Sequence, residues 1–189
     1  MKSNEWWTIL VKNLIKEDAL AKNIQPPSEP HAARIGLATY EEFKQAKYWA
    51  KYENADLILD KLKQNGYKLG VISNFDERIF NIIKNLNLSN FFDFVLIPST
   101  ANGFYKPKRE IFLQAQAKSN VKSSNMMLHV GDDIDLDYLA AVNCDFKSIL
   151  LIHDSTGSNN ANKIQLIQEK KYVYANNLND LYDKILNKF

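Results

Sequence analysis

From residue 67 onward the sequence alternates short apolar runs with helical stretches, and this alternation constrains the fold more than any other feature. The apolar runs cover 69–73, 94–98, 126–130, 146–152 and 172–174, and the helical stretches cover 77–86, 107–117, 136–142 and 178–186. Such alternation is typical of right-handed crossovers in a mainly parallel sheet that is covered by helices. The sequence therefore predicts an α/β fold, in which ligands bind beyond the carboxyl ends of the strands.

The first third of the chain is predicted to be helical instead. Apolar side chains recur at three- and four-residue spacing from Trp6 to Leu14 and from Ile35 to Trp49, which indicates two amphipathic helices. The segment 25–30 holds three prolines and predicts a turn between them. A third helix over 54–64 is expected to end at Gly66, because glycine suits a left-handed C-cap. We expect a helical part over 1–52 and an α/β part over 53–189.

Composition excludes several classes of protein and of site. The 189 residues carry a net charge of only +2, and their basic residues form no dense run, so neither nucleic acid nor a membrane is expected as a partner. Cys144 is the single cysteine, which excludes an intramolecular disulfide and a cysteine-based zinc cluster. The apolar run 6–11 is too short for a secretory signal or a membrane span. We expect an intracellular protein, cytoplasmic or nuclear.

Polar residues follow the first apolar run at the point where a helix begins. Ser73 and Asn74 directly follow the run, and Asp76 comes two residues later. A helix N-terminus offers free backbone N–H groups and partial positive charge, so Ser73 and Asn74 are candidate phosphate ligands. The alternative is that Ser73, Asn74 or Asp76 only caps the helix, as these residue types commonly do.

A second polar segment precedes the helix expected over 107–117. Pro107 suits the first helical turn, which places Lys106 at the mouth of the sheet. An ammonium group there would neutralise phosphoryl oxygens and a neighbouring carboxylate. The alternative is an ordinary solvated lysine, of which this chain has many.

A third polar segment contains four aspartates within residues 132–137, directly after the apolar run 126–130 and Gly131. Repulsion between clustered carboxylates is unfavourable unless a cation or strong donors offset it. Mg²⁺ is one interpretation, with Asp132 as a ligand beside waters and a substrate phosphate. In the alternative, Asp133 and Asp135 face water in the first turn of a helix.

Taken in order, these segments resemble three motifs of the haloacid dehalogenase superfamily. Ser73 resembles the second motif, Lys106-Pro107 the third, and Gly131-Asp132 followed by Asp137 the fourth. Residues 67–76 and 92–96, together with Trp6-Trp7, are similar to the branch called haloacid dehalogenase-like hydrolase domain-containing protein 3.

The resemblance implies a parallel Rossmann-like sheet with an α-helical cap, of which residues 1–52 would be the later part. It implies that Ser73 binds phosphate, where Asn74 stays a candidate from its position alone, and that Lys106 is the catalytic lysine, contacting phosphate and nucleophile. It also implies that Asp132 ligates Mg²⁺ and that Asp137 supports the metal site. Asp133, beside them in the sequence, is a further candidate ligand.

The first motif of the superfamily, an Asp-x-Asp pair on the first strand that supplies the nucleophile, has no counterpart here. Upstream of residue 67 the aspartates are Asp18, Asp56 and Asp60, and none follows an apolar strand or stands two residues from another. In the superfamily the missing strand is the middle one, between the strands that here end at Ser73 and Gly131. Because neighbouring strands lie about 4.8 Å apart, its loss leaves a gap of about 10 Å or forces the flanking strands to pair.

Two functions are compatible with these motifs. The first is a haloacid dehalogenase-like hydrolase of the Mg²⁺-dependent phosphatase type that is catalytically incompetent for want of its nucleophile, with weakened Mg²⁺ binding and a small phosphorylated metabolite as ligand. The alternative is a non-catalytic binding or regulatory protein that uses the retained phosphate and metal loops. No feature of the sequence identifies a protein partner.

Overall fold

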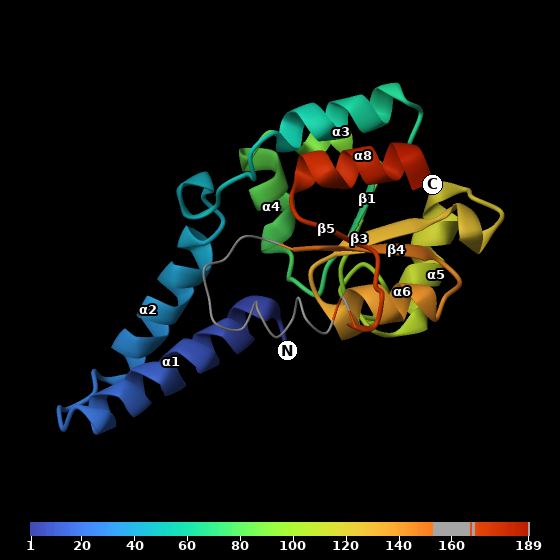
Figure 1. The fold of residues 1–189 in the computed structure, drawn as a ribbon. Helices are drawn as coiled ribbons and strands as arrows, with labels where there is room; N and C mark the ends of the chain where they lie inside the picture. Colours follow the sequence, from blue (N-terminus) through green and yellow to red (C-terminus); the bar gives the residue numbers. More distant parts are fainter. Residues whose placement is uncertain (153–166, 168, 189) are drawn as a thin grey trace. The chain divides into compact units, whose positions relative to one another are not determined.

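The computed structural model describes residues 1–152, 167 and 169–188 (Figure 1). The chain forms two compact units, each described by itself below. The first unit combines Met1–Ala50 with Phe75–Asn87, and the second combines Lys51–Asn74 with Leu88–Phe189. The sequence-based division into a cap over 1–52 and a core over 53–189 stays a prediction.

The first unit is helical, as the apolar spacing of its sequence predicts. It contains α1 (Ser3–Ala21), α2 (Glu29–Glu42), the short 3-10 helix η1 (Ala46–Tyr48) and α4 (Arg78–Asn85). Helices α1 and α2 approach closely at Gly36, where an added Cβ would lie 2.9 Å from the Thr8 Cα. The proline-containing turn therefore joins two helices that pack against each other.

Arg78 is the buried charge of this first unit. Its side chain is 2% exposed, and its guanidinium donates hydrogen bonds of 2.7–3.1 Å to both carboxylate oxygens of Asp76. The guanidinium carbon lies 4.2 Å from the ring centroid of Trp7 and 4.4 Å from that of Tyr40. One guanidinium nitrogen, Nη1, is buried without a hydrogen-bond partner in the described structure. Arg78 thus joins α1, α2 and α4 through stacking and one ion pair.

The second unit is the predicted α/β part. Its helices are α3 (Ala55–Gln64), η2 (Ser89–Phe91), α5 (Arg109–Ser119), η3 (Ser124–Met126), the π-helix η4 (Ile134–Leu139), α6 (Ala140–Val142) and α8 (Leu178–Lys188). Its strands are β1 (Gly70–Ile72), β2 (Phe94–Leu96), β3 (Leu128–Gly131), β4 (Lys147–Leu151) and β5 (Tyr174–Ala175).

The strands form two parallel sheets rather than one. Strand β1 pairs with β2, and β3, β4 and β5 form a separate sheet in that order. Within the part of the chain that the structure describes, β1 has no strand neighbour besides β2, and β3 none besides β4. In the described structure β1 and β3 do not pair with each other, and the loss of a middle strand stays a prediction. The predicted parallel α/β architecture is confirmed.

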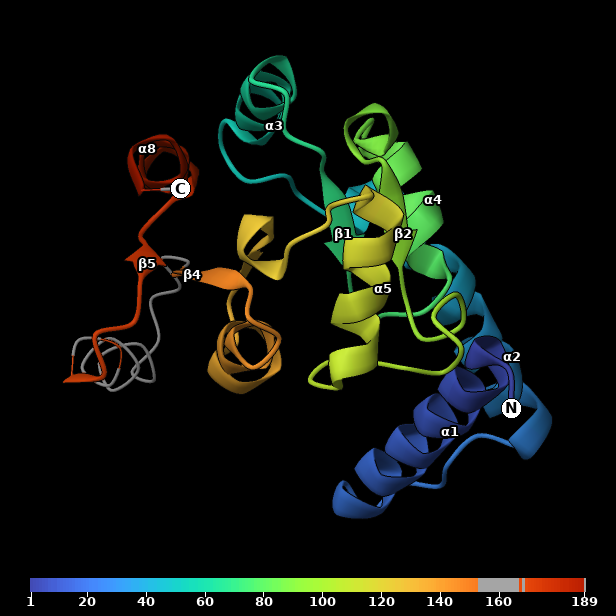
Figure 2. The same ribbon diagram turned by 90° about the vertical axis from the view of Figure 1, so that its right-hand side faces the viewer.

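Two hydrophobic clusters hold these sheets in one unit although their strands do not pair. One cluster contains Ile111 and Phe112 of α5, Ala141 of α6 and Leu96 of β2, with Met127 packed against it. The other packs α3 and α8 against β4, and Leu69, which precedes β1, packs against it together with side chains of β3. Figure 2 shows β1 and β2 standing apart from β4 and β5 within this unit.

Some helix boundaries differ from the sequence-based expectation. Helix α5 begins at Arg109, with Lys108 as its extended N-cap, so Pro107 precedes the helix instead of lying in its first turn. In the part of the chain that the structure describes, no helix has the length and hydropathy needed to cross a membrane.

Candidate functional site

The structure brings the three polar segments of the second unit together at the carboxyl ends of β1 and β3. Lys106 Nζ lies 2.5 Å from Asp137 Oδ1, which links the segment before α5 to the segment after β3. Both side chains are largely buried, at 13% and 4% exposure respectively. A lysine that is largely buried and paired with a carboxylate differs from an ordinary solvated lysine. The geometry therefore favours a functional role for Lys106 at the carboxyl ends of the strands.

Asn74 holds the backbone of Lys106 in place. The Lys106 N–H donates to Asn74 Oδ1 at 2.7 Å, and Asn74 Nδ2 donates to the Lys106 carbonyl at 2.8 Å. The segment after β1 is therefore joined to the segment before α5 by a pair of hydrogen bonds. Because an amide nitrogen carries two N–H donors, its one bond to Lys106 leaves a second donor for another acceptor.

Asp76 is the residue of this segment that bonds to the start of α4. Helix α4 begins at Arg78, and the Arg78 N–H donates to Asp76 Oδ1.

Asp137 is the centre of a buried hydrogen-bond network. Its Oδ1 accepts from Lys106 and lies 2.8 Å from His129 Nε2, and its Oδ2 accepts from the Asp133 N–H at 3.2 Å. Burial by itself disfavours the charged carboxylate, but the hydrogen bonds and charges of His129 and Lys106 outweigh it and hold the pKa of Asp137 well below its usual range. Asp137 is thus an ionised anchor for Lys106.

Gly131 is required for this arrangement. It ends β3 directly below the Asp137 side chain, and a Cβ added at Gly131 would overlap the Asp137 carboxyl group. Only glycine therefore lets this carboxyl lie against the end of the strand. The Gly131-Asp132 spacing that suggested a functional motif has this packing reason.

Asp133 acts as the N-cap of the π-helix η4. Its Oδ1 accepts hydrogen bonds from the N–H groups of Asp135 and Leu136 at 2.9 and 2.8 Å. The sequence-based alternative placed Asp133 and Asp135 in the first turn of a helix, whereas the structure places Asp133 at the N-cap and Asp135 in the first turn. It places Asp132, the preceding residue, between the end of β3 and the start of η4.

The donor set at this end of the sheet suits a metal that takes few protein ligands. Throughout the described ranges, no group of three or more His, Cys, Asp or Glu side chains is arranged to hold a metal ion. Mg²⁺ is commonly bound by only one or two carboxylates with waters and substrate phosphate, and Asp132 has the chemistry for that role. Asp137 and Asp133 accept the hydrogen bonds given above. These metal assignments stay predictions.

Sequence reasoning missed His129 as a member of the site. Its imidazole contacts Asp137 and packs edge-on against Phe112, with ring centroids 5.1 Å apart. Strand periodicity could have found it, because residues two apart in a strand share a face. His129 and Gly131 therefore lie on the same face of β3, where Asp137 packs.

Comparison with known proteins decides the family. The family model described as haloacid dehalogenase-like hydrolase matches residues 10–151. The chain belongs to the haloacid dehalogenase-like hydrolases. Among curated relatives, haloacid dehalogenase-like hydrolase domain-containing protein 3 of Bos taurus is 33% identical over 141 residues, covering 75% of this chain and 53% of the relative. This agrees with the branch that the sequence motifs resemble.

One further curated relative and one solved structure extend the comparison. Glyceraldehyde 3-phosphate phosphatase of Methanothermobacter thermautotrophicus is 31% identical over 140 residues, covering 74% of this chain and 61% of the relative. The magnesium-bound hydrolase YfnB of Bacillus subtilis shares the fold with a TM-score of 0.61 at 18% identity, covering 80% of this chain and 63% of that structure. The chain thus spans between half and two-thirds of the length of these relatives.

Proposed function

We propose that this chain is a haloacid dehalogenase-like hydrolase of the Mg²⁺-dependent phosphatase type that keeps its phosphate- and metal-binding segments but does not catalyse phosphoryl transfer as residues 1–189. The observation that carries the proposal is the continuous set of hydrogen bonds from Asn74 through Lys106 to Asp137 and His129. It supports a preorganised anion site, because residues of the chain itself fix the position of Lys106.

Each residue then has a role in binding a small phosphorylated metabolite. The Ser73 hydroxyl and the Asn74 amide donate hydrogen bonds to phosphate oxygens, and the Lys106 ammonium neutralises their charge. Asp137 positions Lys106 through the 2.5 Å contact. Asp132 ligates Mg²⁺, which when bound supplies charge neutralisation beside the phosphate. The phosphatase name of one relative and the magnesium in another support this choice of ligand and metal.

Catalytic incompetence is proposed from the chemistry of the reaction. Covalent phosphoryl transfer needs a nucleophile, whereas positioning and charge stabilisation alone do not form the intermediate. In the sequence, no Asp-x-Asp pair follows an apolar strand before residue 67. We accordingly propose binding of phosphate and Mg²⁺ without turnover, and with weaker Mg²⁺ binding than a complete site would have.

The test is hydrolysis of an aryl phosphate by purified residues 1–189 in the presence of Mg²⁺. We expect no turnover above that of a mock preparation. The matched variant is Asp132→Asn, which removes the metal-binding charge while keeping the side-chain shape. Robust hydrolysis by the unmodified chain that disappears in Asp132→Asn would show that the chain is a competent enzyme and would refute the proposal.

The second candidate is a non-catalytic binding or regulatory protein. The observation that favours it is that Asn74 binds the Lys106 backbone and Asp137 binds the Lys106 ammonium, all within the second unit. Lys106 is therefore held in position for an anion by residues of this unit alone. Specific binding of phosphorylated compounds by a soluble, monomeric and inactive chain would support this function. Aggregation of the purified chain would support an incomplete hydrolase instead.

A further inference from the structure

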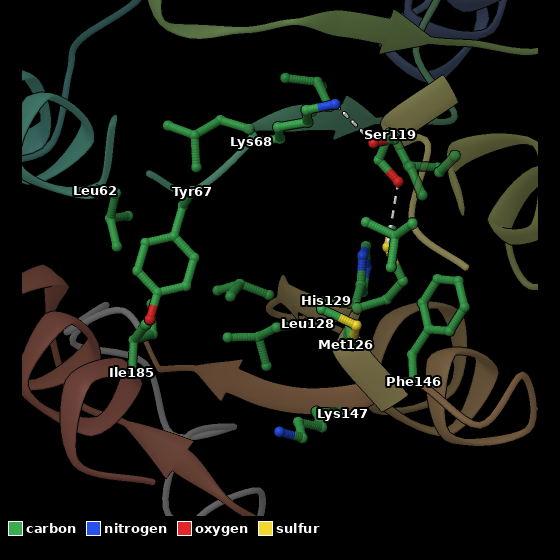
Figure 3. A pocket seen from close by; sticks show the side chains of 18 of the residues that line it. Leu62, Tyr67, Lys68, Ser119, Met126, Leu128, His129, Phe146, Lys147 and Ile185 are labelled. Atoms are coloured by element: carbon green, nitrogen blue, oxygen red, sulfur yellow. Dashed lines mark hydrogen bonds between the residues drawn. The ribbon is translucent and has the colours of Figure 1, made fainter. Parts of the chain in front are cut away.

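The second unit contains a cavity of about 950 Å³ that is lined by residues of both β1 and β3 (Figure 3). Its volume lies at the upper end of the range of about 300–1,000 Å³ found for small-molecule sites. Most of the lining side chains are apolar, among them Leu62, Leu69, Phe94, Leu128 and Ile185. The cavity therefore has the size and the lining of a site for the apolar part of a small molecule.

The rest of the chain covers the apolar walls of this cavity incompletely. Four lining side chains of β1 and β3 are only partly buried, namely Val71, Ile72, Leu128 and Val130. By contrast, Ile149 of the neighbouring strand β4 is fully buried. Burial of apolar surface is favourable roughly in proportion to the area removed from water. An alkyl chain in the cavity would therefore gain binding free energy by covering these four side chains.

The full charges that line the cavity have one sign. Lys68 and Lys147 belong to the lining, and among the residues that the structure describes no Asp or Glu does. Asp93, whose charge interacts with that of Lys68, lies outside the lining and accepts hydrogen bonds from Lys63 Nζ and the Leu69 N–H. A recess lined by one sign of charge attracts the opposite sign. The cavity therefore favours an anionic ligand over a cationic one.

Both lysines stand at the amino ends of strands, whereas the candidate phosphate site lies at the carboxyl ends. Lys68 precedes β1 by two residues and Lys147 is the first residue of β4. Figure 3 shows them on opposite sides of the cavity. Lys68 Nζ donates to the Ser119 carbonyl at 3.0 Å. Because an ammonium group has three donors, this bond leaves donors for a ligand.

The length of the cavity wall indicates the length of the ligand. Strand β3 has four residues, which span about 13 Å at about 3.3 Å per residue. With C–C bonds of about 1.5 Å, an extended alkyl chain of about ten carbons covers the same length. The cavity is also partly open to solvent, so a ligand of this length needs a polar end that stays hydrated.

We propose that the cavity binds a monomeric, single-chain carboxylate of the fatty-acid type, with about ten to twelve carbons as set by the wall length. The alkyl chain lies against β1 and β3, and the carboxylate lies at the amino ends of the strands, attracted by Lys68 and Lys147. Binding is non-covalent and requires neither phosphate nor Mg²⁺, so its failure is separate from failure of the proposed function.

The first test is calorimetric titration of the protein with octanoate, decanoate and dodecanoate below their micelle concentrations. We expect saturable binding that tightens about ten-fold for every two carbons added, because each buried CH₂ contributes to the binding free energy. Dodecylammonium has the same chain and the opposite charge, and we expect it to bind at least ten-fold more weakly than dodecanoate. Absence of saturable binding, equal binding of the three carboxylates, or equal binding of dodecylammonium would overturn the proposal.

Matched variants test the two charges. We expect Lys68→Gln and Lys147→Gln each to weaken decanoate binding about five-fold, the upper end for a solvent-accessible ion pair. Lys108→Gln removes an exposed lysine of the same unit that does not line the cavity, and we expect it to have no effect. Decan-1-ol carries no charge and should bind all these proteins equally. Equal effects of the three variants on decanoate, or a parallel loss of decan-1-ol binding, would overturn the role of the two lysines.

Backbone amide shifts in NMR locate the bound carboxylate without any variant. We expect decanoate to shift the amides of Val71, Leu128 and Val130, with smaller changes at Lys106 and Asp132. Inorganic phosphate is expected not to displace it. Shifts centred on Lys106 and Asp132, or displacement by phosphate, would place the carboxylate at the proposed phosphate site and overturn the assignment to the cavity.

Discussion

The contact between Lys106 and Asp137 allows a quantitative prediction, because both side chains are largely buried and have few alternative partners for their charges. The two charges lie 2.5 Å apart at 13% and 4% exposure. Removing one member of a buried pair costs about 3–5 kcal/mol, because the other charge stays buried without compensation. We expect Asp137→Asn to fall in this range, since it leaves the Lys106 ammonium without its carboxylate.

The reverse change is expected to cost less. In Lys106→Met the aliphatic stem is kept, and the Asp137 carboxylate retains His129 and the Asp133 N–H. We therefore expect a cost of about 2 kcal/mol, the middle of the range of about 1–3 kcal/mol for a broken buried polar contact. In the double variant neither charge remains, and the coupling energy is expected to be about 2 kcal/mol. For a chain of this size, 3 kcal/mol corresponds to a fall in Tm of about 6–12 °C.

The assay is urea denaturation of the four proteins of this cycle, followed by far-UV circular dichroism. Tryptophan fluorescence supplies an internal control, because all three tryptophans, Trp6, Trp7 and Trp49, belong to the first unit and the pair belongs to the second. Costs that add within about 0.5 kcal/mol, the usual behaviour of independent sites, would refute the reasoning that the two groups form one buried pair.

Three further predictions concern other parts of the structure. Arg78→Lys is expected to destabilise the first unit by about 2–3 kcal/mol, because lysine cannot make the two-pronged contact with Asp76 or stack as a plane; an unchanged urea midpoint by tryptophan fluorescence would contradict this. Gly131→Ala is expected to cost about 1–3 kcal/mol through overpacking against Asp137, measured by circular dichroism, and a neutral effect would show that the carboxyl lies elsewhere. Because its folded-state pKa is lowered, Asp137 contributes stability above the unfolded carboxyl's pKa of about 3.9 that is lost as the pH falls through the folded value. We therefore expect the free energy of unfolding of Asp137→Asn to fall less steeply at acidic pH than that of the unmodified protein. An identical fall in both proteins would contradict an ionised Asp137.

The sequence predicted the second unit well because its signals are local. The apolar runs at 69–73 and 146–152 contain β1 and β4, and the alternation of runs and helices correctly indicated parallel pairing. The helix expected from Pro107 begins two residues later at Arg109, since helix ends depend on the N-cap conformation of Lys108. The π-helix η4 was not predicted, because the capping of its first turn by Asp133 depends on backbone geometry.

Contacts between distant segments were harder to predict. Motif order indicated that Ser73, Lys106 and Asp132 would come close, but Asn74 was assigned to phosphate while its amide also holds the Lys106 backbone. The stacking of Arg78 on Trp7 and Tyr40 joins residues 71 and 38 positions apart in the chain, and no periodicity within one helix indicates it.

In our proposal, three separate segments of the second unit form one site for phosphate and Mg²⁺. The most direct measurement is a titration of isotope-labelled protein with MgCl₂ and inorganic phosphate, following backbone amide chemical shifts by NMR. We predict saturable shifts at Ser73, Lys106 and Asp132 together, with the Mg²⁺-dependent part lost in Asp132→Asn. Shifts confined to one segment, or none at millimolar concentrations of both ions, would contradict the account.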